Sequence, residues 1–203
     1  IENSFGIYRS LDKLTSDYFY KKLGMENLGF LPLQRIDSSR VVPTEADFEF
    51  RSQLLKGYVH DMGAAMQGGV GGHAGLFSNA NDLAKLMQMY LQNGEYAGER
   101  YLSEEVVKEF TECQFPDNYN RRGAGFDKAA LPNEEGGPAS ENASQKGFGH
   151  SGFTGTLVWA DPETQIVYVF LSNRIHPDAT NKKLLDMDVR TNIMEVIFNS
   201  VNE

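Results

Sequence analysis

Apolar side chains recur at helical spacing in three stretches of the chain. The clearest stripe follows an i, i+3, i+4, i+7, i+8 pattern and consists of Leu83, Leu86, Met87, Tyr90 and Leu91. Ser78 or Asn79 can cap this helix, and Asp82 places a carboxylate in its first turn, where it suits the helix dipole. Asn93-Gly94 is a typical stop signal. The pattern therefore predicts an amphipathic helix between the cap and Asn93.

The other two stripes lie toward the ends of the chain. Leu11, Leu14 and Tyr18 share one face of a helix that Ser10 can cap and that ends near Leu23-Gly24-Met25. The third stripe predicts a long C-terminal helix and consists of Leu185, Val189, Ile193, Val196, Ile197 and Val201. Ser103 can cap a further short helix, and residues 1–6 resemble a last helical turn closed by Gly6.

Strand patterns are concentrated between residues 148 and 171. We expect strands at 148–151, 154–160 and 166–171, with a proline-containing turn at 161–164. The last run is continuously apolar, which is typical of a strand buried on both faces. Helices followed by an antiparallel hairpin and a terminal helix predict an α+β fold, in which helices cover an antiparallel sheet.

Two long segments show no regular spacing of apolar residues. We expect residues 26–60 to form a long, irregular and packed segment with short strands. Irregular segments of this length tend to line functional sites. Residues 127–146 are polar and contain Pro132, Gly136-Gly137 and Pro138, so we expect a mobile surface loop there.

Composition places these elements in one globular domain of 203 residues with 40% hydrophobic residues. A net charge of −9 argues against nucleic acid as a partner. The only dense basic spots, Arg121-Arg122 and Lys182-Lys183, are expected to be ordinary surface. No apolar run reaches membrane-spanning length. One cysteine, Cys113, excludes an internal disulfide and is expected to be a packed or surface thiol.

The segment from Gly147 to Thr156 carries the sharpest candidate chemistry. Small residues flank His150 and Ser151, and Gly149 and Gly152 would let a ligand lie along the strand. The Phe153 N–H could then act as an oxyanion donor. The alternative is a glycine-kinked strand with a solvent-facing histidine.

Histidines elsewhere offer weaker candidates. His60-Asp61 could be an oriented general base or simply a turn, and adjacent strand residues point to opposite faces. His73 lies in a glycine-rich segment, residues 68–75, that lacks the residues of a phosphate loop. We interpret those glycines as positions where backbone passes close to backbone, with His73 packed inside. The four histidines show no metal-ligand spacing, so we expect no metal and no cofactor.

Serine hydrolysis requires a serine with a base beside it. The only S-x-x-K tetrad is Ser10-Leu11-Asp12-Lys13. Its neighbours are polar, whereas a nucleophile helix should be buried under a cleft, so we interpret Ser10 as a helix cap. Ser140-Glu141-Asn142 matches S-x-N but lies in the polar loop and is interpreted as chance.

Several of these motifs, in this order, resemble one known family. They are Leu23-Gly24-Met25, Gly72 to Ser78 with Asp82-Leu83 in the next helix, and His150-Ser151-Gly152 followed by Asp161-Pro162 and Asn173-Arg174. The chain resembles the C-terminal part of the serine β-lactamase and penicillin-binding-protein superfamily, in the branch nearest class C enzymes and their esterase relatives. The implied fold is a partial β-lactamase/transpeptidase-like fold without its N-terminal segment, spanning residues 1–203 as part of a single domain.

The resemblance assigns roles to particular residues. Of the three family motifs, only the lysine- or histidine-threonine/serine-glycine strand maps onto this chain, at His150, Ser151 and Gly152. It implies catalytic roles there and substrate or oxyanion contacts at Phe153 and Thr154. His60, Asp61 and His73 are further candidates for substrate contacts. The serine–lysine and tyrosine motifs are expected before residue 1, so we expect this chain alone to be inactive and the missing N-terminal part of the domain to be its partner.

In the third family motif, His150 takes the place of lysine. This difference indicates esterase or peptidase-like acyl transfer as much as β-lactam hydrolysis. The stretches Val59-His60-Asp61 and 173–177 also resemble a subgroup of bacterial envelope proteins in which this domain follows a β-N-acetylglucosaminidase-type glycoside hydrolase. That resemblance implies a small-molecule, peptide or cell-wall-derived substrate and a periplasmic or envelope location. The alternative is a non-catalytic module that binds peptidoglycan-like or peptide ligands.

Overall fold

The computed structural model describes residues 10–118, 120–131, 134 and 136–202. The chain forms two compact units, which are described separately below. Unit 1 comprises residues 1–82 and 173–181, and unit 2 comprises residues 83–172 and 182–203. The helical turn predicted at residues 1–6 and the proline at 132 lie outside the described residues.

Unit 2 is built on a four-stranded antiparallel sheet in the order β5-β6-β7-β8. The strands are β5 (Asp127–Lys128), β6 (Phe148–Ser151), β7 (Leu157–Asp161) and β8 (Ile166–Phe170). In register, Gly149 pairs with Trp159 and His150 with Val158. The side chain of Asp161 accepts hydrogen bonds from the backbone N–H groups of Glu163 and Thr164, which confirms the predicted turn.

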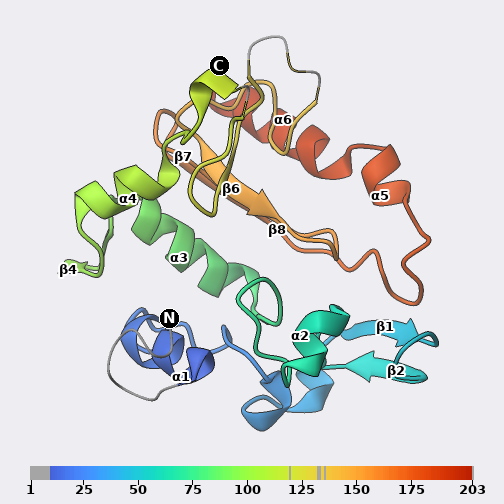
Figure 1. The fold of residues 1–203 in the computed structure, drawn as a ribbon. Helices are drawn as coiled ribbons and strands as arrows, with labels where there is room; N and C mark the ends of the chain where they lie inside the picture. The colour runs from blue at the N-terminus through green and yellow to red at the C-terminus, as the bar shows by residue number, and fades with distance from the viewer. Residues whose placement is uncertain (1–9, 119, 132–133, 135, 203) are drawn as a thin grey trace. The chain divides into compact units, whose positions relative to one another are not determined.

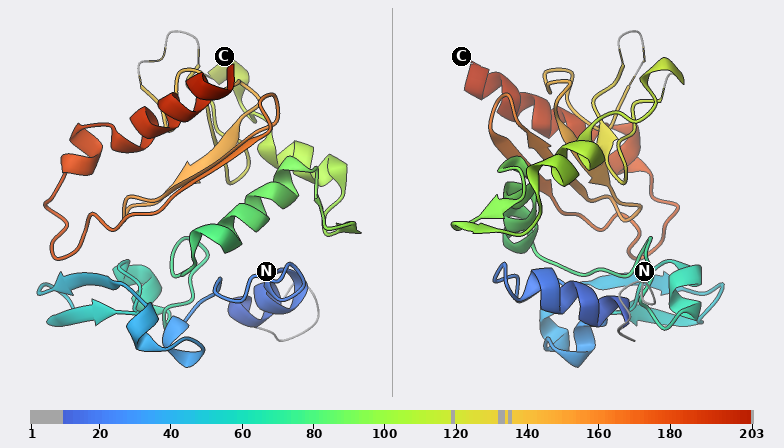
Figure 2. Two further views of the ribbon diagram at one scale, coloured as in Figure 1. Left: turned by 180° about the vertical axis from the view of Figure 1, so that it is seen from behind. Right: turned by 60° about the vertical axis from the view of Figure 1, so that its left-hand side comes forward.

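Helices cover both faces of this sheet (Figures 1 and 2). On one face, α6 (Val189–Asn202) buries Met194 and Phe198 against Leu157, Trp159 and Tyr168. On the other face, Met87 and Leu91 of α3 (Ala80–Leu91) pack with Phe148 and Ala160. The alternation of strand side chains between the two faces produces these two cores. The predicted α+β architecture with a helix-covered antiparallel sheet is therefore confirmed.

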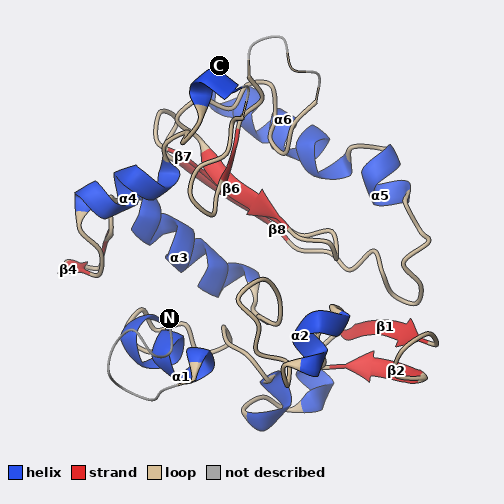
Figure 3. Ribbon diagram, in the orientation of Figure 1, coloured by secondary structure: helices blue, strands red, loops and turns tan. Residues whose placement is uncertain are grey.

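The remaining elements of unit 2 are short (Figure 3). They are β3 (Glu95–Tyr96), β4 (Glu99–Arg100), α4 (Glu104–Thr111), a 3-10 turn (Pro116–Asn118) and α5 (Lys183–Asp186). The Ser103 hydroxyl accepts a hydrogen bond from the Val106 N–H at 3.3 Å, so the predicted cap of α4 is confirmed. The Asn79 side chain likewise accepts from the Asp82 N–H at the start of α3.

Two burial predictions for unit 2 are wrong. β8 was expected to be buried on both faces, but it is the last strand of the sheet and only Tyr168 within it is buried. The expected inward stripe of the C-terminal helix is wrong at Leu185, Ile193, Val196 and Val201, which are 37 to 69% exposed, although Ile197 does pack against the core. The stripe did not include Met194 and Phe198, which fill the core instead. A positive φ at Asp188 further divides the expected single helix into α5 and α6.

The polar segment 127–146 is not simply a surface loop. It begins as strand β5 and buries Ala129 and Ala143 in the core beneath α6. Ser140 is buried as well, and its hydroxyl donates a short hydrogen bond to Glu195 of α6. The expectation of a surface loop is therefore wrong for these described parts, where packing overrides a polar composition.

Unit 1 contains short elements joined by irregular chain, as expected for residues 26–60. Its elements are α1 (Leu11–Thr15) continued by a π-helical turn (Ser16–Tyr20), 3-10 turns at Pro32–Gln34 and Ser38–Arg40, the antiparallel pair β1 (Pro43–Asp47) and β2 (Gln53–Lys56), and α2 (Met62–Met66). Gly24 adopts a φ of 63° just after the first helix, which confirms the predicted stop. Residues 173–181 return to this unit, where the Asn173 amide donates to the Thr44 carbonyl at 3.0 Å.

Candidate active site

The strongest candidate site lies on β6 in unit 2. His150 is exposed and Ser151 is half-buried at the end of this strand. Within the described residues, β5 pairs only with Phe148 and Gly149, so its pairing stops before His150. On its other side, β6 is paired with β7 along its whole length. The strand edge beside His150 and Ser151 is therefore a place where an extended ligand could add to a rigid sheet.

His150 is held by hydrogen bonds at both ring nitrogens. Its Nδ1 lies 2.7 Å from the Ser151 carbonyl oxygen, and its Nε2 lies 3.2 Å from Nη1 of Arg122. The Arg122 side chain is 49% exposed, so a guanidinium stands at the surface next to the strand. Sequence reasoning missed Arg122, because 27 residues separate it from His150 in the chain.

A buried carboxylate fixes this arginine. Asp127 of β5 is 4% exposed and lies 3.2 Å from Nη2 of Arg122. The same carboxylate accepts a 2.8 Å hydrogen bond from Nε of Arg121, which also forms a short ion pair with Glu134. The expectation that Arg121-Arg122 is ordinary surface is therefore wrong, since both guanidiniums are tied to the edge strand of the sheet.

Neighbouring atoms explain why Gly149 and Gly152 carry no side chain. A Cβ atom on Gly149 would lie 2.0 Å from the Val158 carbonyl oxygen, and one on Gly152 would lie 2.4 Å from Oγ1 of Thr156. The packing of the sheet and its turn thus gives both positions a structural reason for glycine, beside the prediction that they let a ligand lie along the strand. Phe153 is 60% exposed and Thr154 half-buried in the turn that follows β6.

The candidate residues of unit 1 form two separate pairs. Nδ1 of His60 lies 2.6 Å from a carboxylate oxygen of Glu45. Asp61 instead caps α2 by accepting from the Ala64 N–H, and it lies 2.8 Å from Nε2 of His73. The hydrogen bond from Ala64, followed by that from His73, lowers the pKa of Asp61. His60 and Asp61 therefore do not act as a dyad with each other.

The glycine-rich segment of unit 1 is only partly as expected. A Cβ atom on Gly75 would lie 2.4 Å from the Gly69 carbonyl oxygen, which confirms the close passage of backbone past backbone. The side chain of His73, however, is 56% exposed, so the prediction that it is packed inside is wrong. Its partner, the Asp61 carboxylate, is exposed at the N-terminus of α2, and the contact between them keeps the His73 ring at the surface.

The serine motifs found in the sequence have structural explanations. Ser10 is exposed and occupies the N-cap position of α1 without a side-chain capping hydrogen bond, so the position is confirmed but the bond is not. No residue of α1 is buried, and Lys13 is exposed. Ser140 and Asn142 both donate to Glu195, which anchors their segment to α6.

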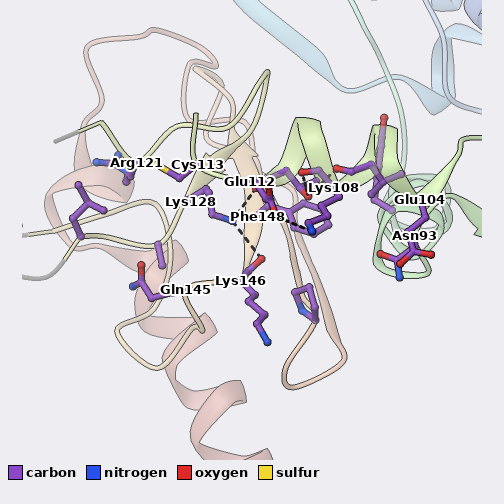
Figure 4. Close-up of a pocket in the computed structure, with 16 residues that line it drawn as sticks. Asn93, Glu104, Lys108, Glu112, Cys113, Arg121, Lys128, Gln145, Lys146 and Phe148 are labelled. Carbon is purple, nitrogen blue, oxygen red and sulfur yellow. Dashed lines mark hydrogen bonds and ion pairs between the residues drawn. The ribbon is translucent and has the colours of Figure 1, made fainter. Parts of the chain in front are cut away.

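Unit 2 also contains a cavity of about 450 Å³ (Figure 4). It lies between α4 and the start of β6, and the 16 residues that line it include Cys113 and Lys128 but not His150. The Lys128 ammonium donates to the carbonyls of Thr111 and Gly147 at 2.9 and 3.0 Å, with that of Lys146 at 3.4 Å. Burial lowers the pKa of Lys128. Cys113 donates to the Asn120 carbonyl. The hydrogen bonds from Lys128 and Cys113 to backbone carbonyls indicate a structural role for both side chains.

The described residues contain no cluster of histidine, cysteine, aspartate or glutamate suited to holding a metal ion. Within the same part of the chain, no helix has the length and apolar character needed to cross a membrane.

Comparison with known proteins identifies the family. The Beta-lactamase family profile matches residues 1–190. Proteins named "Putative D-alanyl-D-alanine carboxypeptidase" from Salmonella paratyphi B and Salmonella newport are 33% identical over 186 residues, which covers 86% of this chain and 42% of theirs. This chain thus spans less than half the length of these relatives.

Solved structures show the same fold. A β-lactamase from Mycobacterium bovis is 18% identical with a TM-score of 0.62, over 98% of this chain and 59% of that one. Simvastatin synthase from Aspergillus terreus is 13% identical with a TM-score of 0.63, over 98% of this chain and 52% of that one. With its matching profile, its relatives and its helix-covered antiparallel sheet, the chain belongs to the β-lactamase family.

Proposed function

We propose that β6 and the turn after it form one wall of the acyl-transfer site of a serine hydrolase. The observation that carries the proposal is the free strand edge beside His150 and Ser151, on a strand held rigidly by its pairing with β7. An extended peptide-like substrate can pair with such an edge. The relatives named as D-alanyl-D-alanine carboxypeptidases support a cell-wall peptide as the substrate and the bacterial envelope as the location.

Within that site, each residue has a defined task. Ser151 supplies a hydroxyl and the strand edge supplies backbone groups that hold the substrate in line. The Phe153 N–H donates to the oxyanion that forms when the acyl carbonyl is attacked. His150, with its polar ring at the surface, lies beside the substrate. Separately from the β6 site, we propose that His60, Asp61 and His73 of unit 1 take part in substrate binding.

The nucleophile comes from outside these 203 residues in this proposal. A nucleophilic serine needs a base beside it in a site shielded from solvent. Ser10 and Lys13 form the only S-x-x-K tetrad, yet both are exposed on a helix with no buried residue. We therefore propose that the remainder of the domain provides serine and lysine, and that the 203-residue chain alone is inactive.

The experiment uses the protein that contains this chain together with the rest of its domain. Incubation with a peptide ending in D-alanyl-D-alanine should release D-alanine, and mass spectrometry should detect an acyl adduct on a serine outside residues 1–203. The Ser10→Ala variant is the matched control and should retain full activity. Loss of activity in that variant would contradict the assignment of the nucleophile.

The second candidate is a non-catalytic module that binds peptidoglycan-like or peptide ligands, favoured by the same free strand edge. Saturable binding of the peptide without release of D-alanine or formation of an adduct would support the binding module and contradict the hydrolase.

A further inference from the structure

The cavity of unit 2 has a largely apolar interior. Among the side chains that line it, those of Val107, Ala129 and Phe148 are buried, with 3 to 5% of their surface exposed. The cavity volume of about 450 Å³ lies in the range of pockets that hold small organic molecules. Neither His150 nor Ser151 lines it. A ligand in this cavity would therefore bind at a place other than the free strand edge.

Basic side chains predominate among the charged residues of the cavity wall. In a chain whose net charge is −9, four cationic and two carboxylate side chains line this cavity. The cations are Lys108, Arg121, Lys128 and Lys146, and the carboxylates are Glu104 and Glu112. Three of the four cations form ion pairs with carboxylates of unit 2, which are Lys108 with Glu112, Lys146 with Glu163, and Arg121 with Asp127 and Glu134.

Lys128 is the cation without such a partner. The residue is only 8% exposed, and in the described part of the chain no carboxylate forms an ion pair with its ammonium. Backbone carbonyls accept its hydrogens instead, two of them at 2.9 and 3.0 Å and that of Lys146 at 3.4 Å (Figure 4). Glu112 and Asp161 attract it only from beyond ion-pair distance. The carbonyls satisfy N–H groups but leave a buried positive charge without a counter-ion, which is costly in a protein interior.

We propose that this cavity is a second ligand site, which binds a small organic anion with an apolar body. The body packs on Val107, Ala129 and Phe148, and the anionic group supplies the counter-ion that Lys128 lacks. The 3.4 Å hydrogen bond to the Lys146 carbonyl is the longest of the three, so this N–H turns most readily toward a ligand. The ligand is not the acyl substrate of the strand edge, and the inference does not rest on the proposed function.

The test uses two fluorescent probes of similar shape that differ in charge. They are anilinonaphthalene sulfonate, which is an anion, and phenylnaphthylamine, which is uncharged at neutral pH. The protein that contains this chain and the rest of its domain should bind the sulfonate saturably and more tightly than the neutral probe. Lys128→Met should weaken binding of the sulfonate by about 10- to 100-fold, the range for hydrogen bonds to a charged group. Binding of the neutral probe should change little.

Two further variants locate the site. Lys146→Met removes the same charge from an exposed side chain that is paired with Glu163, and it should change the affinity for the sulfonate by less than about threefold. Val107→Trp fills the cavity from α4 while keeping Lys128, and it should weaken binding of both probes. Thermal unfolding shows whether each variant is folded. Equal affinities of a folded Lys128→Met protein and the unaltered protein for the sulfonate would overturn the anion site.

A second measurement does not depend on the Lys128 variant. Cys113 lines the same cavity as a free, half-buried thiol. Iodoacetamide should alkylate Cys113 several-fold more slowly when the sulfonate is bound, as measured by mass spectrometry of the peptide that contains this residue. An unchanged rate at saturating sulfonate would mean that the probe binds elsewhere, and would overturn the site. Neither result bears on the hydrolysis of acyl substrates, so this inference can fail while the proposed function stands.

Discussion

Trp159 packs so closely onto Gly149 across β6 and β7 that no side chain fits between them. A Cβ atom on Gly149 would lie 2.6 Å from Cε3 of Trp159 and 2.0 Å from the Val158 carbonyl oxygen. Since one of these atoms belongs to the backbone of the neighbouring strand, small side-chain adjustments cannot relieve the overlap. The residue next to His150 is thereby restricted to glycine by the core of the sheet.

Replacing Gly149 with alanine should therefore separate β6 from β7 locally. We expect Gly149→Ala to lower the free energy of unfolding by about 3 kcal/mol, the upper part of the usual range for overpacking. Urea denaturation provides the measurement. Gly72→Ala is the matched control, because a Cβ atom there meets nothing within 4 Å, and it should change stability by less than about 0.5 kcal/mol. Equal effects of the two changes would contradict this account.

Lys128 should make the protein more stable as pH rises into the alkaline range. Burial lowers its pKa below the ordinary value of 10.5, so between the lowered pKa and 10.5 the unfolded chain binds more protons than the folded one. The free energy of unfolding should thus increase with pH in that interval. Lys128→Met should remove this part of the slope, measured by denaturation at several pH values between 8 and about 10.5.

Lys128→Met should also be less stable at neutral pH, because the carbonyls of Thr111 and Gly147 lose their buried donor. A loss of about 2 kcal/mol is expected for such unsatisfied groups. Lys146→Met removes the same charge from a side chain that is 70% exposed, and should affect neither stability nor slope. Identical pH profiles for Lys128→Met and the unaltered protein would argue against a shifted pKa in the folded state.

Glu195 anchors the segment around Ser140 to α6. Its carboxylate accepts hydrogen bonds from the Ser140 hydroxyl and the Asn142 amide. Removal of these acceptors in Glu195→Ala should release the segment, and limited proteolysis within residues 136–146 should become several-fold faster. Glu109→Ala, at an exposed position of α4, should leave the cleavage rate unchanged. Unchanged cleavage in Glu195→Ala would mean that other contacts of the segment hold it, such as the burial of Ala143 and the hydrogen bonds from Ser144 to Asp161.

The local elements of this protein were determined by the sequence alone. Hydrogen bonds between residues close in the chain form the caps at Asn79 and Ser103, the stop at Gly24 and the Asp161 turn. Such bonds form wherever the right side chain occurs at the right spacing. The ordered motifs around His73 and His150 indicated the family for a related reason, since their spacing is a property of the chain.

The tertiary structure decided which faces of these elements are buried and which charges meet. Apolar residues occur on more than one face of α6, so its periodicity could not select Met194 and Phe198 over Val196. Only packing against the sheet did so. The position of β8 at the sheet edge depends on strand order, which no strand encodes by itself. Arg122 reaches His150 because β5 pairs with β6. Contacts between residues far apart in the chain depend on the packing of the whole unit, so no local pattern could reveal this arginine.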